Sequence, residues 1–306
     1  MSIRSLDLLD IPIIARYRND VLTLDSARAL TRGHPLGAMG LLAYINPTRH
    51  LYAAIANGDQ SALLGGVIHT RGDTFAKLLY LAPSSRLNDP QLPALIEHLA
   101  SQAGTWKAFH VIAEVEETSK VFSPLRKAGF SVYAQQRMWD VSGIEKTESG
   151  RRSAWRRMQS VDLPAVQSLH YQIVPPSLHP IEPAPNRVIG FVHEQDIKCY
   201  VSITSGMHGI VLTPLIHPEE NDVEAKIAAL MNGLPDRRGR RVYLNVRSYQ
   251  TWLEPALEDL GAQPSTRQAV MVKHLVRLVK DTVAARVAPS NASIQPSRIS
   301  RMKVDE

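Results

Sequence analysis

Three glutamates stand directly after an apolar run of the sequence and are its clearest candidates for proton transfer. The run covers residues 109–113, and Glu114, Glu116 and Glu117 follow it. A carboxylate within hydrogen-bond reach of an amine can act as a general base, which makes Glu114 and Glu116 candidate catalytic residues. Acidic residues also stabilise the first turn of a helix, because they face the positive end of its dipole. The alternative, which the sequence favours, is a solvated helix start without a catalytic role.

Cysteine and histidine offer little further chemistry. The one cysteine, Cys199, excludes an intrachain disulfide, and its place inside a strand-like run predicts a buried structural thiol. The 11 histidines include no His-Glu-x-x-His pattern and no other pair at metal-ligand spacing, so we predict no metal site. Residues 33–40 are rich in glycine but lack the Lys-Ser/Thr pair that a P-loop requires.

The charge balance is basic but unevenly distributed. The formal net charge is +6, from 35 Lys and Arg residues against 29 Asp and Glu residues, which is compatible with an anionic partner. Residues 273–306 alone hold seven basic and three acidic side chains. Two further arginine clusters, within 151–157 and 237–241, lack the interleaved aromatic residues that favour single-stranded nucleic acid. We therefore do not expect nucleic acid as a partner, and we interpret the clusters as solvated surface.

Neither a signal peptide nor a membrane span is predicted. Charged residues interrupt the first 20 residues of the chain, so this segment lacks the apolar core of a signal peptide. Apolar runs elsewhere are much shorter than the roughly 20 residues that a membrane-spanning helix needs. We therefore expect a cytoplasmic protein.

A pattern that occurs twice predicts an internal duplication. Residues 3–12 and 155–164 share apolar-Arg-x-apolar followed by Asp-apolar-Pro, at an offset of 152 residues. In each copy this predicts a short strand, an aspartate N-cap and a helix that begins at proline. Gly129 and Gly261 each follow a helix-like stretch, at an offset of 132 residues, where a left-handed residue would end the helix. The second copy is thus about 20 residues shorter in its middle.

Hydrophobic periodicity gives both copies the same order of elements. A strand and a helix come first, then three antiparallel strands, then helix, strand, helix and strand. The later predicted strands of the first copy are 51–56, 63–70, 75–82, 108–115 and 134–141, with helices at 10–18, 90–103 and 118–128. We divide the chain into a first domain at 1–141, a linker at 142–153, a more divergent second domain at 154–276, and a helix with a disordered basic tail at 277–306.

This order, together with two local motifs, resembles the acyl-CoA N-acyltransferase fold of the GNAT superfamily. Residues 78–83 and 95–99 look like the fourth strand and third helix of that family, and Leu-Arg-Lys-Ala-Gly-Phe at 125–130 resembles the helix end before its last strands. The likeness covers 1–141 well and 154–275 more weakly. It implies an α/β fold with two tandem GNAT-like domains, each a mostly antiparallel sheet flanked by helices.

The resemblance also implies a cofactor. In the family, acetyl-CoA lies between the fourth and fifth strands, and its pyrophosphate meets backbone amides at the start of the third helix. Carried over to this sequence, the cofactor-binding residues would be Leu79, Leu81, Arg86 and Asn88. The acceptor would be an amine, either a small molecule or a peptide.

The phosphate loop departs from the family pattern in both copies. In the first copy Asp89 stands at the position of the first glycine, and two prolines nearby remove amide donors. In the second copy residues 217–222 hold three carboxylates and neither glycine nor arginine. The tyrosine that often serves the family as general acid is replaced by Leu125 and Leu257.

These observations leave three hypotheses. The first is an N-acyltransferase in which an amine attacks the acetyl-CoA thioester directly. The second is a catalytically silent GNAT-like module for binding or dimerisation, with a homodimer as one form. The third gives the arginine clusters an anionic partner. The sequence does not decide between the first two.

Overall fold

The computed structural model describes residues 2–7, 10–37, 48–57, 62–144, 154–193, 197–235 and 237–275. The chain from Met1 to Val276 forms one compact unit. Most of the predicted linker, 145–153, and the predicted helix and tail at 277–306 lie outside the described residues. The division of the chain into two domains stays a prediction.

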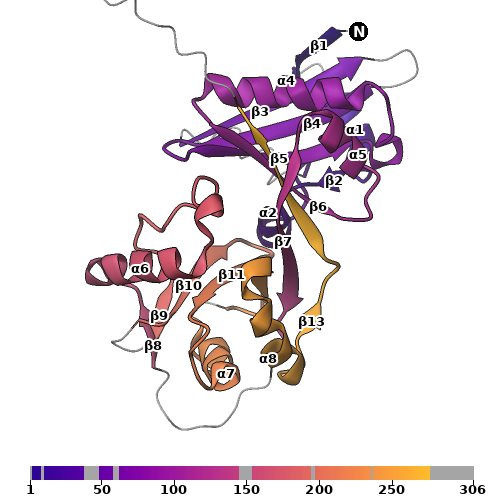
Figure 1. Cartoon of the computed structure of the whole chain (residues 1–306). Helices are drawn as coiled ribbons and strands as arrows, with labels where there is room; N and C mark the ends of the chain where they lie inside the picture. The colour runs from indigo at the N-terminus through magenta and orange to yellow at the C-terminus, as the bar shows by residue number, and fades with distance from the viewer. Residues whose placement is uncertain are drawn as a thin grey trace, which may run out of the picture. The chain divides into compact units, whose positions relative to one another are not determined.

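The first half of the chain contains the predicted strand and helix order with small shifts of boundary (Figure 1). Strand β5 has the predicted bounds, and α4 forms because Leu92, Leu95, Ile96 and Leu99 recur on one helical face, which packs on β3 and β4. The elements are β1 (Ser2–Ser5), α1 (Ile11–Tyr17), β2 (Leu22–Thr23), α2 (Ser26–Arg32), β3 (Arg49–Asn57), β4 (Ala62–Thr70), β5 (Phe75–Ala82), η3 (Ser84–Arg86), α4 (Leu92–Thr105), β6 (His110–Glu116), α5 (Phe122–Lys127) and β7 (Ser131–Asp140).

The second half repeats this order with several shorter strands and a shorter α7. The helix-like stretch before Gly261 is divided into a 3-10 segment and a short α-helix, and the strand β9 has only three residues. The elements are β8 (Trp155–Arg157), η4 (Ser160–Asp162), α6 (Leu163–Ile173), η5 (Pro176–Leu178), β9 (Phe191–His193), β10 (Cys199–Ser205), β11 (Gly209–Ile216), α7 (Val223–Gly233), β12 (Arg241–Arg247), η6 (Ser248–Leu253), α8 (Glu254–Asp259), β13 (Gln263–Pro264) and β14 (Gln268–His274).

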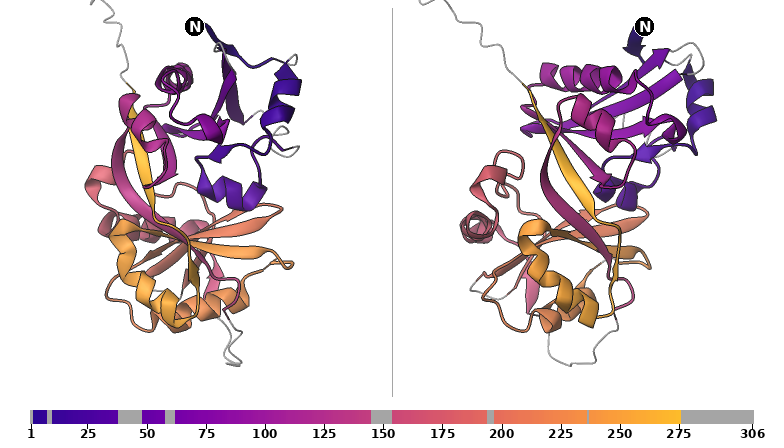
Figure 2. Two further views of the ribbon diagram at one scale, coloured as in Figure 1. Left: turned by 90° about the vertical axis from the view of Figure 1, so that its right-hand side faces the viewer. Right: turned by 45° about the vertical axis from the view of Figure 1, so that its right-hand side comes forward.

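One mixed sheet runs through both halves. Within the described residues its main order is β1-β3-β4-β5-β6-β14-β7-β12-β11-β10-β9-β8, and only β5–β6 and β11–β12 are parallel pairs. The last strand of each half is exchanged, since β14 lies between β6 and β7, while β7 lies between β14 and β12. Figure 2 shows β7 and β14 side by side. The fold class is therefore α/β with a mostly antiparallel sheet, and the exchange ties the two halves together.

The duplicated sequence pattern has a structural counterpart that differs from the prediction. Asp10 and Asp162 do not cap their helices with side-chain hydrogen bonds. Instead, Arg4 and Arg156 each donate two hydrogen bonds to the aspartate six residues later, at 2.6–2.7 Å. The shared arginine and aspartate of the pattern thus form one ion pair per half, which ties the first strand to the first helix.

Several local predictions are confirmed. Gly129 and Gly261 follow their helices with φ values of +82° and +74°, the left-handed conformation expected of a helix end. Cys199 is buried in β10. Among the described residues, no helix combines the length and the apolar character needed to cross a membrane.

Candidate functional site

Strands β5 and β6 part at the point where the GNAT resemblance places the cofactor. They pair in parallel only from Phe75–His110 to Lys77–Ile112. Beyond that point, residues 78–82 of β5 and 113–116 of β6 make no ladder with each other, and we call this gap the β5–β6 opening. Parting strands expose backbone donors and acceptors, which must find partners elsewhere.

The chain itself fills the β5–β6 opening. Strand β2 pairs antiparallel with β5 in the register Leu22–Leu81 and Thr23–Tyr80. The Leu24 amide donates to the Leu79 carbonyl at 2.9 Å, and the Leu24 carbonyl accepts from the Glu114 amide at 2.9 Å. Leu24 therefore bridges the two strands with its backbone, and its side chain is 1% exposed.

An internal carboxylate covers the start of the predicted phosphate loop. Asp20 lies just before β2, and its side chain accepts hydrogen bonds from the Ser85 amide at 3.2 Å, the Ser85 hydroxyl at 2.8 Å and the Ser84 hydroxyl. The Asp20 carbonyl also accepts from the Ser84 amide at 3.1 Å. Hydrogen bonds from Ser84 and then Ser85 outweigh burial and hold the pKa of Asp20 below its ordinary value. The carboxylate of Asp20 thus already occupies the Ser85 amide at the start of the predicted phosphate loop.

The predicted cofactor residues lie along this filled opening. Leu79 and Leu81 are buried in β5, and both belong to the segment that pairs with residues 22–24. Arg86 forms an ion pair with Asp89, whose carboxylate also accepts from the Gln91 amide at 2.8 Å. Asn88 is exposed. The assignment of these four residues to a cofactor stays a prediction.

The two candidate bases occupy different environments. Glu114 is 4% exposed in β6 and accepts a hydrogen bond from the Ser26 amide at 2.9 Å, so the predicted solvated helix start is wrong for this residue. Burial raises the pKa of Glu114, but Lys77 and Arg247 outweigh it and the net shift is downward. Glu116 is exposed and accepts from the Thr266 hydroxyl at 2.7 Å. An ion-paired, buried carboxylate with a lowered pKa is a poor proton acceptor near neutral pH.

Lys77 is the centre of a buried charge network that the sequence analysis missed. Its ammonium lies 3.1 Å from Asp25 and 3.5 Å from Glu114. Burial alone would lower the pKa of Lys77, but the two carboxylates raise it above its ordinary value. Asp25 also caps α2, since it accepts from the Arg28 amide at 3.3 Å. A lysine inside the otherwise apolar run of β5 was the available signal.

The second half has an equivalent gap, which a side chain fills. Strands β11 and β12 pair in parallel only from Gly209–Arg241 to Leu212–Leu244, and the β11–β12 opening lies beyond. Gln250 of η6 is fully buried there, accepts from the Ile216 amide at 3.0 Å and donates to the Pro214 carbonyl at 2.9 Å. Its amide thus satisfies the free backbone of β11, as β2 does for β5.

Acetyl-CoA does not fit either opening in this arrangement. The carbonyl of Leu79 and the amide of Glu114 are already paired with Leu24, and Gln250 holds the corresponding backbone of β11. At the predicted phosphate loop, the carboxylates of Asp20 and Asp89 would repel a pyrophosphate. Binding would require residues 20–25 or the Gln250 side chain to leave.

A separate cavity of about 260 Å³ lies beside Lys77, between α2 and the strands of the first half. Three of its lining arginines come from two elements, Arg28 and Arg32 from α2 and Arg49 from β3. Thr204 of β10 contributes to the same wall from the second half. The cavity is therefore formed where the two halves meet. The sequence carried no signal for it, because its lining residues are up to 179 positions apart.

Other candidate chemistry is sparse. Within the part of the chain that the structure describes, no three His, Cys, Asp or Glu side chains gather as a metal site. Within the second predicted arginine cluster, Arg237 donates to the Ser142 carbonyl and Arg240 donates to the Ser205 hydroxyl at 2.7 Å, so these two side chains hold loops in place.

Solved structures show which fold this is. A GCN5-related N-acetyltransferase from Sphaerobacter thermophilus is similar with a TM-score of 0.54 and 15% identity, covering 89% of this chain and 95% of the other. A tandem GNAT protein from the clavulanic acid biosynthesis pathway, solved without acetyl-CoA, has a TM-score of 0.52 and 13% identity, covering 89% and 98%. No family model matches the sequence, and no curated protein does. The chain has the tandem GNAT fold.

Proposed function

We propose that this protein is a tandem GNAT-fold binding module that works without coenzyme A. The observation that carries the proposal is the occupation of both openings by the chain's own atoms. Leu24 bridges β5 and β6 with its backbone, and Gln250 holds β11 with its side-chain amide. A thioester cofactor would have to displace these hydrogen bonds and the carboxylate of Asp20 before it could bind.

N-acyl transfer is the second candidate. It is favoured by the parting of β5 and β6 after Lys77, the strand geometry that the cofactor would use in a GNAT enzyme. Acetyl-CoA would then bind along Leu79 and Leu81 and beside Arg86 and Asn88, and the acceptor would be a small-molecule or peptide amine. This function requires that residues 20–25 move out of the opening.

Calorimetric titration of the full chain with acetyl-CoA separates the two candidates. The binding module predicts no saturable heat, and no release of coenzyme A thiol with a panel of small amines and lysine peptides. Saturable binding of acetyl-CoA would overturn the proposal, and thiol release in addition would support N-acyl transfer.

Two variants show whether the occupation itself is the cause. Asp20→Ala frees the Ser85 amide and the hydroxyls of Ser84 and Ser85, whereas Asp259→Ala removes an exposed carboxylate from α8. If the internal carboxylate excludes the cofactor, only Asp20→Ala gains weak acetyl-CoA binding. Equal binding by the wild type and both variants would show that residues 20–25 do not exclude it.

A further inference from the structure

The cavity beside Lys77 carries an excess of positive charge that the protein does not neutralise. Within the described residues, the guanidinium groups of Arg28, Arg32 and Arg49 form no hydrogen bond and no ion pair, although all three are partly buried. Burial lowers the pKa of Arg28, and repulsion from Arg32 lowers it further; the same two causes lower the pKa of Arg49.

The carboxylates around the cavity are too few to balance these arginines. Among the lining residues, the carboxylate of Asp25 balances the ammonium of Lys77 at 3.1 Å. Glu114, the second partner of Lys77 at 3.5 Å, does not line the cavity and also faces Arg247. Asp73 is the other carboxylate that lines the cavity. Three arginines against this one carboxylate leave an excess of two positive charges.

One wall of the cavity, helix α2, packs against strands of the second half. Helix α2 contacts β10 and β11 (Figure 2), and the His208 amide donates to the Thr31 carbonyl at 3.0 Å. Gly206 permits this approach, because a Cβ there would stand 2.1 Å from the same carbonyl oxygen. Arg28 and Arg32 are therefore fixed on a helix whose position is set on both sides.

We propose that this cavity binds a small organic dianion, a phosphate monoester or a dicarboxylate, which Arg28, Arg32 and Arg49 hold through charge-assisted hydrogen bonds. Two negative charges on the ligand match the excess of the cavity. Phe75 and Ile68 provide an apolar wall for the carbon part, and Thr70 and Thr204 provide hydroxyl donors. The volume of about 260 Å³ is below that of a drug-sized site and suits a metabolite of a few carbon atoms.

This inference deepens the proposed function by naming what the module binds. It rests on that function in one respect: the ligand occupies the cavity and neither of the two openings. Its test is separate from the acetyl-CoA titration. Anion binding without acetyl-CoA binding supports both proposals. If acetyl-CoA also binds, only the binding-module proposal falls; if neither binds, only the dianion proposal falls.

The experiment titrates the full chain with glycerol 3-phosphate, succinate and inorganic phosphate in separate calorimetric runs. Saturable binding of glycerol 3-phosphate or of succinate supports the site and assigns its chemistry to phosphate or to dicarboxylate. Binding of inorganic phosphate alone would overturn the proposal that the ligand is organic.

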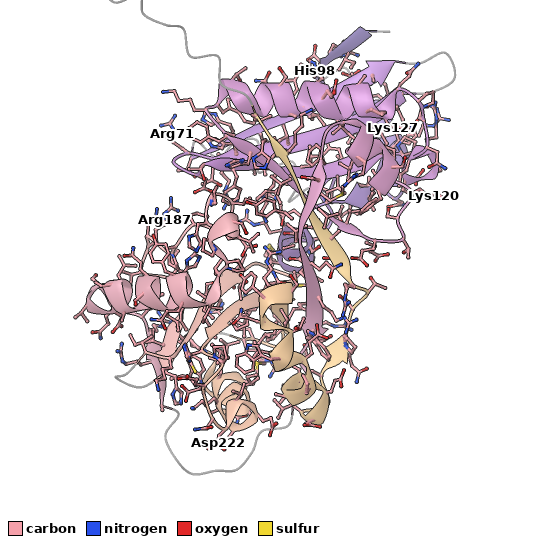
Figure 3. All side chains as sticks on the ribbon, in the orientation of Figure 1. Arg71, His98, Lys120, Lys127, Arg187 and Asp222 are labelled. Atoms are coloured by element: carbon pink, nitrogen blue, oxygen red, sulfur yellow. The ribbon has the colours of Figure 1, made fainter. Side chains whose placement is uncertain are left out.

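We expect Arg28→Gln and Arg49→Gln each to weaken the binding about tenfold, since each loses charge-assisted hydrogen bonds. Arg126→Gln, on the exposed surface of α5, is the matched control and should leave the binding unchanged; its neighbour in sequence, Lys127, is labelled in Figure 3.

Thermal unfolding provides the readout that a purely structural arginine would not give. Without ligand, Arg28→Gln should keep or raise the midpoint, because it relieves repulsion with Arg32 and Arg49. With ligand, the wild type should gain a rise in midpoint that the variant lacks. A lower midpoint for Arg28→Gln without ligand, or equal weakening by Arg126→Gln, would refute the site.

Discussion

Replacing Lys77 by methionine tests the charge network that joins the cavity to the β5–β6 opening. Methionine keeps much of the apolar stem and removes the ammonium. Asp25 and Glu114 then lose the cation that lies 3.1 and 3.5 Å from them. Both carboxylates are almost fully buried, with side chains 9% and 4% exposed, so water cannot replace the lost charge freely.

The expected loss is large for a single substitution. Removing one partner of a buried ion pair costs about 3–5 kcal/mol, because it leaves an uncompensated buried charge. The Lys77 side chain is 27% exposed, which allows partial solvation and places the expected value at the lower end, about 3 kcal/mol. Arg247 still faces Glu114 in the variant, and this remaining cation also reduces the expected loss of stability.

The loss should depend on pH in a defined sense. In the wild type the pKa of Glu114 is lowered, so its stabilisation is present above its ordinary pKa of 4.5 and disappears as the pH falls through the lower folded value. Without Lys77, burial raises the pKa of Glu114, and the carboxyl takes up a proton at mildly acidic pH. The gap in stability between wild type and Lys77→Met should therefore be widest near pH 7.5 and narrow towards pH 5.

Urea unfolding followed by tryptophan fluorescence measures this gap, since Trp139 is fully buried. Lys120→Met removes an exposed lysine and serves as the control (Figure 3). Glu114→Gln in the Lys77→Met background should restore part of the stability, because it removes one unpaired charge. A gap below about 0.5 kcal/mol, the range of ordinary surface substitutions, or one that stays constant from pH 5 to 7.5, would refute the reasoning.

Three further substitutions test the structure elsewhere. Gln250→Leu leaves two buried backbone groups of β11 without partners and should lower the urea-unfolding free energy by about 3 kcal/mol, whereas a neutral effect would show that water enters the β11–β12 opening. Gly206→Ala places a Cβ 2.1 Å from the Thr31 carbonyl oxygen and should cost about 1–3 kcal/mol in the same assay; unchanged stability would mean that α2 shifts freely. Asp162→Asn should lower the thermal midpoint at pH 7, and the difference should vanish on acidification through the lowered pKa of Asp162; a difference that persists at low pH would rule out the Arg156 pair as its cause.

Local sequence patterns predicted the order of helices and strands, because each of these elements depends mainly on residues that are close in sequence. The run at 75–82 gives a strand in β5 with the same bounds, and the helix ends at Gly129 and Gly261 follow from the conformational freedom of glycine. The resemblance to the GNAT fold rested on this order and is confirmed by similar solved structures. The exchange of β7 and β14 was not predictable, because both candidate partners of each strand have the same apolar character.

The site was less predictable because its residues act over long distances. Arg28, Arg49 and Thr204 become neighbours only through the packing of α2 against both halves. The neighbours of Glu114 in the sequence favour a solvated residue. In the structure, residues 22–24 fill the β5–β6 opening and bury it. Lys77, a charge in an apolar strand, was the one local signal that could have pointed to the network.

The filling of both openings follows from a requirement of the fold. Two parallel strands that part in the middle of a sheet leave amides and carbonyls without ladder partners, and buried backbone groups must be paired. A ligand that lies in such a gap can pair with some of these groups. A chain that does not bind the cofactor must supply its own atoms, or it carries the cost of each unpaired group, about 1–3 kcal/mol. The two halves meet this requirement by different means, a backbone segment at Leu24 and a side-chain amide at Gln250. The two openings therefore share one requirement and differ only in the atoms that meet it.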